Sequence, residues 1–232
     1  MARRRVIFHI DVNSAFLSWT AIRLMKDGMS DIRLVPSSRT PNHKWDVVAI
    51  DCGIKYSFIR QLNAKGCNVT IVPYNSTAEE IMAFNPDGIF VSNGPGNPAD
   101  SEVICEALRA LRGKRPIFGV DLGHQLIAIS YGAKNTKMKV GHRGANHPVR
   151  CLENGKLEIV AQNHGYTIDE ASLAGTPLVV THRNLLDDTV AGIESPADRV
   201  FSVQYQPDCS PEASNTYLFD KFIKLMEDEK NA

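Results

Sequence analysis

A sharp strand-to-helix turn constrains this chain more than any other feature. Residues 119–125 read Gly-Val-Asp-Leu-Gly-His-Gln, after the apolar run 116–118 and before an apolar pattern at 126–129. The two glycines of the turn permit close backbone approach. The pattern predicts a buried strand that turns directly into a helix, with Asp121 at the tip. Hydrolases place a nucleophile at such a tip, because the N–H groups that follow it stabilise a developing anion.

Composition limits the classes to which the chain can belong. Its 232 residues suffice for one α/β domain with a sizeable core. Lysine and arginine total 26, as do aspartate and glutamate, so no broad basic surface for nucleic acid is expected. The five cysteines include no Cys-x-x-Cys pair, which favours reduced thiols and a cytoplasmic location. No apolar run approaches ~20 residues, so we expect no membrane span. We also expect no metal and no cofactor.

Strand and helix patterns alternate from residue 46 onward. Continuous apolar strands separated by helices indicate a mostly parallel sheet with helices on both faces. The predicted strands are 47–50, 68–72, 88–91, 116–120, 157–161, 178–181, 189–193 and 200–204, some of the later ones antiparallel. The predicted helices, besides the one that follows the turn, are 55–65, 77–84, 101–112 and 216–226.

Five stretches resemble the motifs of one family. In chain order they are VAIDCGIK at 48–55, SNGPGNP at 92–98, GVDLGHQ at 119–125, QNHGY at 162–166 and QYQPD at 204–208. They resemble class I glutamine amidotransferases, and within that family the small subunit of carbamoyl phosphate synthetase. The resemblance covers about residues 46–226. It implies a flavodoxin-like α/β domain over residues 44–232, after a short appendage at 1–43.

The resemblance carries the family's site onto this chain with three substitutions. The catalytic cysteine, histidine and glutamate of the family correspond to Asp121, Gln206 and Asp208. The positions that hold glutamine in the family correspond to Gly94, Gly96, Leu122, Gln125, Asn163, Gly165 and Tyr166. The glycine-rich loop implies an oxyanion site with the Leu122 N–H as second donor. We therefore expect the Asp121 carboxylate to lie close to the N–H groups of Gly96 and Leu122.

Three interpretations of Asp121 are open. In the first the turn is catalytically inactive, because glutaminase chemistry needs a thiolate and a histidine that later protonates the departing ammonia. Gln206 has no titratable proton with which to replace that histidine. In the second, Asp121 is a nucleophile that forms a covalent intermediate. In the third, Asp121 accepts a cationic group of another ligand. Cys209, three residues after Gln206, is interpreted as a bystander thiol, and His124 and His164 as structural histidines.

The leading functional prediction is a catalytically inactive glutamine amidotransferase-like protein that acts by binding or regulation. One alternative is an active glutamine-hydrolysing amidotransferase, or another hydrolase, that uses non-standard residues. The other is a scaffold or assembly module. The expected partners are a glutamine-like small molecule and either a synthetase-type protein or a second copy of the chain; neither nucleic acid nor membrane is expected.

The first residues follow a different pattern. Residues 5–11 predict a strand and residues 15–26 a helix. They resemble the start of a Y-family DNA polymerase, in which the carboxylate at the Asp11 position binds metal. Asn13 stands at the second acidic position, and one carboxylate cannot hold two metal ions, so no polymerase activity is expected. We interpret the segment as an appendage joined from elsewhere, with an apolar helix face that needs a partner surface. That face carries Phe16, Trp19 and Ile22.

Overall fold

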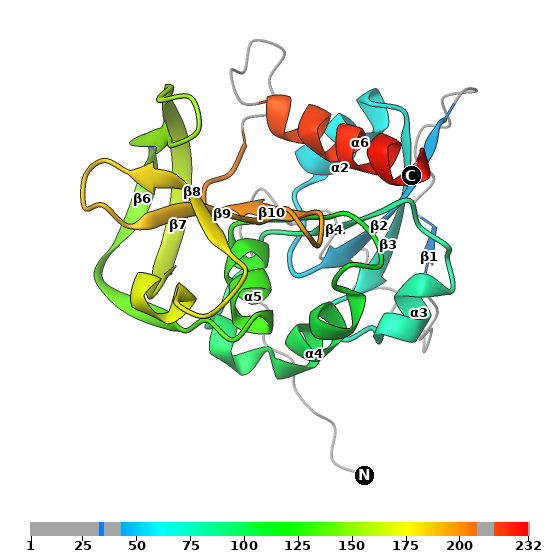
Figure 1. Cartoon of the computed structure of the whole chain (residues 1–232), viewed down its shortest axis with the longest axis horizontal. Helices are drawn as coiled ribbons and strands as arrows, with labels where there is room; N and C mark the ends of the chain where they lie inside the picture. Colours follow the sequence, from blue (N-terminus) through cyan, green and yellow to red (C-terminus); the bar gives the residue numbers. More distant parts are fainter. Residues whose placement is uncertain (1–32, 35–42, 208–215, 232) are drawn as a thin grey trace.

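One ten-stranded sheet forms the centre of the described structure, in the order β1-β3-β2-β4-β5-β10-β9-β8-β6-β7 (Figure 1). This computed structural model describes residues 43–207 and 216–231, together with the backbone of β1 (Arg33–Leu34). The other strands are β2 (Trp45–Asp51), β3 (Cys67–Pro73), β4 (Gly88–Val91), β5 (Ile117–Val120), β6 (Asn135–Cys151), β7 (Leu157–Ile168), β8 (Val179–Asn184), β9 (Val190–Ser195) and β10 (Val200–Val203). The α-helices are α2 (Tyr56–Ala64), α3 (Ala78–Met82), α4 (Glu102–Leu111), α5 (Leu122–Ser130) and α6 (Tyr217–Lys230).

The sheet has a parallel part and an antiparallel part. Strands β3, β2, β4, β5 and β10 lie parallel to one another. Strands β9, β8, β6 and β7 extend the sheet in antiparallel pairs beyond β10, and β1 pairs antiparallel with β3. Helices lie on both faces of the parallel part (Figure 1). The predicted α/β fold class is therefore confirmed.

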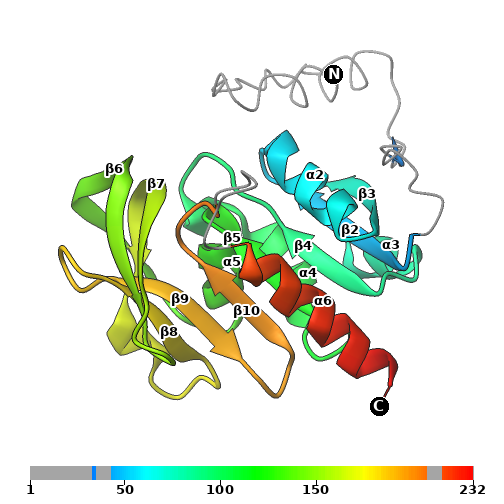
Figure 2. The ribbon, with the colours of Figure 1, turned by 90° about the horizontal axis from the view of Figure 1, so that it is seen from above.

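Two apolar clusters, one on each face, hold the helices against the sheet. In β2, Val48 and Ile50 belong to one cluster and Val47 and Ala49 to the other, because successive side chains of a strand point to opposite faces. The first cluster includes residues of α3, α4 and α5, and the second includes residues of α2 and α6. Figure 2 shows α2 and α6 lying across the same face of the sheet. Burial on both faces explains why these strands are apolar throughout.

Local signals in the sequence fix the bounds of the early elements. Between residues 45 and 120 every observed strand and α-helix begins and ends within two residues of its predicted bounds. At the start of α3, Thr77 Oγ1 accepts a hydrogen bond from the Glu80 N–H, and the Glu80 carboxylate accepts one from the Thr77 N–H. Such a reciprocal capping box satisfies donors that the first helical turn leaves unpaired.

The long hairpin of β6 and β7 corrects the sequence-based prediction. No strand was predicted over β6, and the strand predicted at 157–161 extends to Ile168. The burial pattern of β6 shows no strict alternation, and its pairing with β7 shifts register twice, between Lys137 and His142 and between Gly144 and His147. Such bulges interrupt the period of two on which strand prediction depends.

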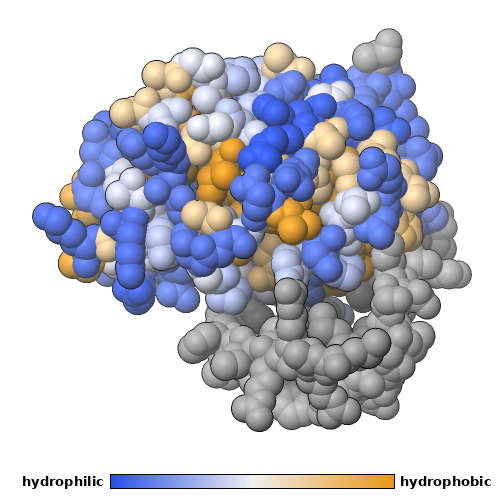
Figure 3. All heavy atoms as spheres, turned by 90° about the horizontal axis from the view of Figure 1, so that it is seen from below, coloured by the Kyte–Doolittle hydropathy of each residue, from blue (hydrophilic) through white to orange (hydrophobic). Residues whose placement is uncertain are grey.

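Several expectations lie outside the described residues. They are the strand at 5–11, the helix at 15–26 with its apolar face, Asp11, Asn13, Asp208 and Cys209. Among the helices that the structure describes, none is long and apolar enough to cross a membrane. Seen from below in Figure 3, the described surface is mostly hydrophilic, and its apolar side chains form small separate patches.

The packing of α6 leads to the first prediction. Phe222 is fully buried, its ring centroid lies 5.9 Å from that of Phe118, and its ring fills the space beside Gly88. We expect Phe222→Ala to lower the free energy of unfolding by about 3–5 kcal/mol, measured by urea denaturation, because it leaves a cavity. The matched control is Lys224→Ala, an exposed position of the same helix, with an effect within about 0.5 kcal/mol. A loss below ~1 kcal/mol for Phe222→Ala would contradict this packing.

Candidate functional site

The turn between β5 and α5 holds Asp121 in a conformation that few residues other than glycine adopt. Its φ is 56° and its ψ is −108°. The Asp121 N–H donates to the Val203 carbonyl at 2.9 Å, and the Gly123 N–H donates to the Ser92 carbonyl at 3.1 Å. A Cβ at Gly123 would overlap the carbonyl of Val91, so glycine is required there. Contacts with β10 and with the end of β4 therefore fix the tip of the turn.

Amide side chains surround the Asp121 carboxylate. Gln204 Nε2 lies 3.4 Å from Asp121 Oδ1, and Gln206 Nε2 lies 3.3 Å from Oδ2. The Leu122 N–H also donates to this carboxylate. Lys55 Nζ donates to Gln206 Oε1, which brings an ammonium group close to the carboxylate. From the sequence we expected the N–H groups of both Gly96 and Leu122 to lie close to this carboxylate. Among the described residues Leu122 donates to it and Gly96 does not.

Burial dominates the electrostatics of Asp121. The residue is 5% exposed, and loss of hydration raises the pKa of its carboxyl from 3.8 to about 7. The hydrogen bond from Gln206, the charge of Lys55 and the hydrogen bond from Gln204 each act in the opposite direction, but they offset only part of the effect of burial. Asp121 is therefore a carboxyl group that titrates near neutral pH.

The hydrogen bonds continue from Asp121 into the wall of the adjacent pocket. Gln125 Nε2 donates to Gln204 Oε1 at 2.8 Å and to the Tyr166 carbonyl at 2.9 Å. Gln125 Oε1 is buried and has no hydrogen-bond partner in the described part of the chain. The network therefore satisfies the donor side of this amide and leaves its acceptor for another group.

A pocket of about 420 Å³ opens beside Asp121. All seven residues to which the resemblance assigns glutamine binding line it: Gly94, Gly96, Leu122, Gln125, Asn163, Gly165 and Tyr166. Asp121 lines it too, whereas Gln206 contacts Asp121 without contributing to the lining. The structure thus brings Asp121 and the seven predicted binding residues together around one cavity.

Both motif histidines are buried and hydrogen bonded. His124 Nδ1 lies 2.9 Å from Ser202 Oγ, and burial lowers the pKa of His124 to about 3. His164 Nδ1 lies 2.7 Å from the Tyr166 carbonyl, and burial lowers the pKa of His164 to about 4. His164 also lines the pocket. Both imidazoles are therefore neutral at pH 7.

Four residues of the site were given no role from the sequence. Lys55 and Gln204 belong to the quoted motifs, so their positions were flagged without a function. Lys137 and Arg143 line the pocket from β6, the strand that was not predicted. The antiparallel register of β6 with β7 places these two residues beside the pocket. That register exists only in the folded hairpin, so the sequence alone does not indicate their role.

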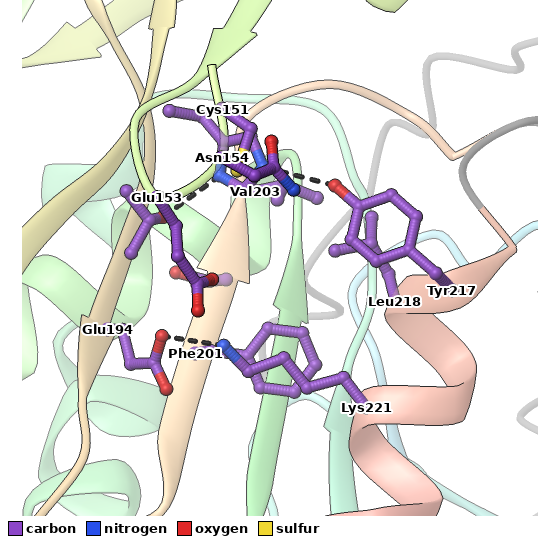
Figure 4. A pocket seen from close by; sticks show the side chains of 12 residues that line it. Cys151, Glu153, Asn154, Glu194, Phe201, Val203, Tyr217, Leu218 and Lys221 are labelled. Carbon is purple, nitrogen blue, oxygen red and sulfur yellow. Dashed lines mark hydrogen bonds and ion pairs between the residues drawn. The ribbon is translucent and has the colours of Figure 1, made fainter. Parts of the chain in front are cut away.

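A second pocket, of about 150 Å³, lies between α6 and strands β8 to β10 (Figure 4). Its polar groups bond to one another: Lys221 Nζ lies 2.6 Å from Glu194 Oε2, and His182 Nε2 lies 3.1 Å from the Tyr217 hydroxyl. Because these groups satisfy each other, the pocket beside Asp121 is the better candidate for function. Among the described residues no cluster of histidine, cysteine or carboxylate side chains has the geometry of a metal site.

Comparison with known proteins identifies the family of the chain. The family model of class I glutamine amidotransferases matches residues 48–225, so the chain belongs to that family. The carbamoyl phosphate synthase small chain of Staphylococcus haemolyticus is 47% identical over 225 residues, covering 95% of this chain and 60% of the relative. The corresponding small chain of Listeria innocua is 46% identical over 207 residues, covering 89% and 57%. The chain thus spans about three-fifths of the length of these relatives.

A solved structure supports the fold independently. The crystal structure of a putative GMP synthase protein from Thermoplasma acidophilum matches with a TM-score of 0.68 at 20% identity, covering 82% of this chain and 97% of that one.

The Staphylococcus alignment leaves only 5% of this chain outside it, and therefore enters the first 43 residues. The division of the chain at residue 43 remains a prediction.

The buried carboxyl predicts a specific dependence of stability on pH. An unfolded aspartate titrates near pH 3.9, so between about pH 4 and 7 the folded state binds the Asp121 proton more tightly than the unfolded state. The stability that this proton binding supplies is lost as pH rises through that interval. As the pH rises from 5 to 8, we expect the free energy of unfolding to fall by roughly 2–3 kcal/mol more in the unmodified chain than in Asp121→Asn.

Urea denaturation at both pH values measures this difference. The control is Asp228→Asn, at an exposed position of α6, whose profile should follow that of the unmodified chain. Parallel profiles for Asp121→Asn and the unmodified chain would show that burial does not control this carboxyl.

Proposed function

We propose that this chain is a glutamine amidotransferase-like protein that does not hydrolyse glutamine and acts through binding. One observation carries the proposal: amide side chains and the Leu122 N–H enclose the carboxylate at the tip of the turn. Hydrolysis of an amide needs a strong nucleophile and a group that protonates the departing ammonia. The neighbour of Asp121 at the position of the family's histidine is Gln206, whose side-chain amide does not act as a general acid or base near neutral pH.

The pocket walls support a binding role. The seven residues that match the family's glutamine positions surround one cavity. The relatives named above are small chains of carbamoyl phosphate synthase, so a synthetase-type protein is the partner class that we propose. In such an assembly the domain would contribute structure or regulation rather than ammonia.

The direct test is ammonia release from glutamine. We expect the unmodified chain and Asp121→Ala to give the same background rate, because loss of a catalytic nucleophile or base typically costs on the order of 10⁶ in turnover. A coupled ammonia assay measures both. Turnover comparable to that of an active small chain, abolished by Asp121→Ala, would establish the alternative, an enzyme with a non-standard nucleophile.

The carboxylate should also weaken glutamine binding. The Leu122 N–H, which would meet the substrate in an active relative, already donates to Asp121. A glutamine carboxamide must displace that bond, and charge-assisted hydrogen bonds contribute roughly 1.5–3 kcal/mol. We expect Asp121→Gly to bind glutamine about tenfold or more tightly than the unmodified chain. Glycine tolerates the positive φ at this position.

Isothermal titration calorimetry compares the two forms, with Asp228→Ala in α6 as a control that should bind like the unmodified chain. Tighter binding by the unmodified chain than by Asp121→Gly would make the carboxylate a ligand-binding group, as in the third interpretation of Asp121.

A further inference from the structure

The side-chain amide of Gln206 is contacted at both ends by groups with the chemistry to react with it. Its carbonyl oxygen accepts a hydrogen bond from Lys55 Nζ, and its nitrogen lies 3.3 Å from Asp121 Oδ2. The amide carbon therefore lies between an amine and a carboxyl group. An amine is a nucleophile and a carboxyl group transfers protons, and the exchange of one amide for another requires both functions.

The backbone holds the amine and the amide in place. Lys55 stands at the N-terminal cap of α2, where its N–H donates to Asn93 Oδ1 at 3.1 Å. Gln206 follows β10, and its N–H donates to the Ala161 carbonyl at 2.9 Å. Both residues are half-buried. The carbon to be attacked is bonded to the oxygen that Lys55 Nζ contacts, so rotation of the lysine side chain brings Nζ onto it. Well-oriented reacting groups reach effective concentrations on the order of 10⁵–10⁸ M.

The neighbours of Lys55 distinguish it from other lysines of the chain. Lys65, Lys221 and Lys230 form ion pairs with carboxylates, whereas Lys55 contacts the neutral oxygen of an amide. Asp121 is close enough for the charge of Lys55 to act on it, but burial prevails and raises the pKa of the carboxyl to about 7. At neutral pH this carboxyl can therefore both accept a proton and return it.

The amine faces the chain's own amide and not the pocket beside Asp121. Neither Lys55 nor Gln206 is among the described residues that line that pocket. A reaction between them therefore needs no ligand, and it ends after one event in each chain.

We propose that the chain forms an isopeptide bond between Lys55 and Gln206, with Asp121 as the group that transfers protons. Lys55 gives one proton to the Asp121 carboxylate, and its neutral amine attacks Cδ of Gln206 to form the new C–N bond. Asp121 returns the proton to Nε2, the bond between Cδ and Nε2 breaks, and ammonia leaves. The ammonia takes up the second proton that the lysine nitrogen loses. An ammonium group and an amide thus give an amide and an ammonium ion, with no further reactant.

This inference goes beyond the proposed function and does not depend on it. The bond would join two residues 151 positions apart in the sequence. A covalent link across so long a loop restricts the unfolded chain and so stabilises the folded one. We expect the bonded chain to unfold at a higher temperature than Lys55→Arg, which cannot form the bond.

Mass spectrometry of the intact, unmodified chain is the first test. After several days in the folded state at neutral pH, we expect a chain lighter than its sequence by one molecule of ammonia. Because other side reactions also release ammonia, digestion with trypsin must locate the bond. Residues 45–60 and 200–221 should appear as one branched peptide, without cleavage after Lys55.

Three variants separate the roles of the amine and the carboxyl. Lys55→Arg keeps the positive charge without the nucleophilic amine, so no branched peptide should form. Asp121→Asn removes the proton transfer and should slow its formation by about 100-fold or more, since general acid–base catalysis contributes roughly 10²–10⁴. The matched control is Lys65→Arg at the end of α2, where the lysine pairs with Asp220. This variant should form the bond as the unmodified chain does.

An unmodified chain of full mass after this incubation, with circular dichroism showing an intact fold, would overturn the inference. A branched peptide that forms equally fast in Asp121→Asn would overturn the role of the carboxyl. Failure of the proposed function is read separately, as repeated ammonia release from added glutamine. The bond instead releases one ammonia per chain with no glutamine present.

Discussion

The contact between the start of α5 and the end of β4 fixes the geometry of the whole site. The Gly123 N–H donates to Ser92, and no side chain at Gly123 would fit against Val91. At the turn that leads into this helix, Asp121 adopts a positive φ of 56°. The turn holds Asp121 at the edge of the pocket, so the chemistry of the pocket depends on this residue.

A carboxylate at this tip reorganises the groups around it. Continuous hydrogen bonds run from Lys55 through Gln206, Asp121 and Gln204 to Gln125. Each amide in this series donates with its nitrogen toward an oxygen, so the series favours the ionised form of a carboxyl whose pKa burial raises to about 7. A proton shuttle would need a group that both accepts and releases a proton, and these glutamines do neither. The arrangement accounts for a site that keeps the shape of a hydrolase pocket and favours binding over turnover.

The parallel half of the fold was predictable because its signals are local. Buried strands read as unbroken apolar runs, and Thr77 and Glu80 mark a helix start within four residues. The turn at Asp121 was predictable from the spacing of its glycines. The hairpin of β6 and β7 was not, since bulges break its pattern and pairing across the sheet determines its register. Lys137 and Arg143 lie on that hairpin, so their place at the pocket follows from a long-range contact that the sequence does not display.

The central claim is that the Asp121 carboxylate makes hydrogen bonds and never a covalent bond. Incubation with glutamine in water enriched in oxygen-18, followed by mass spectrometry of the peptide that contains Asp121, tests it most directly. An aspartate nucleophile would displace ammonia from the glutamine carboxamide and form a mixed anhydride with the glutamyl group. Attack of water on the Asp121 carbonyl of that anhydride would leave the heavy isotope in the side chain over repeated turnovers. Our account predicts no isotope at Asp121 beyond that of a control without glutamine. Glutamine-dependent incorporation at Asp121 would contradict it.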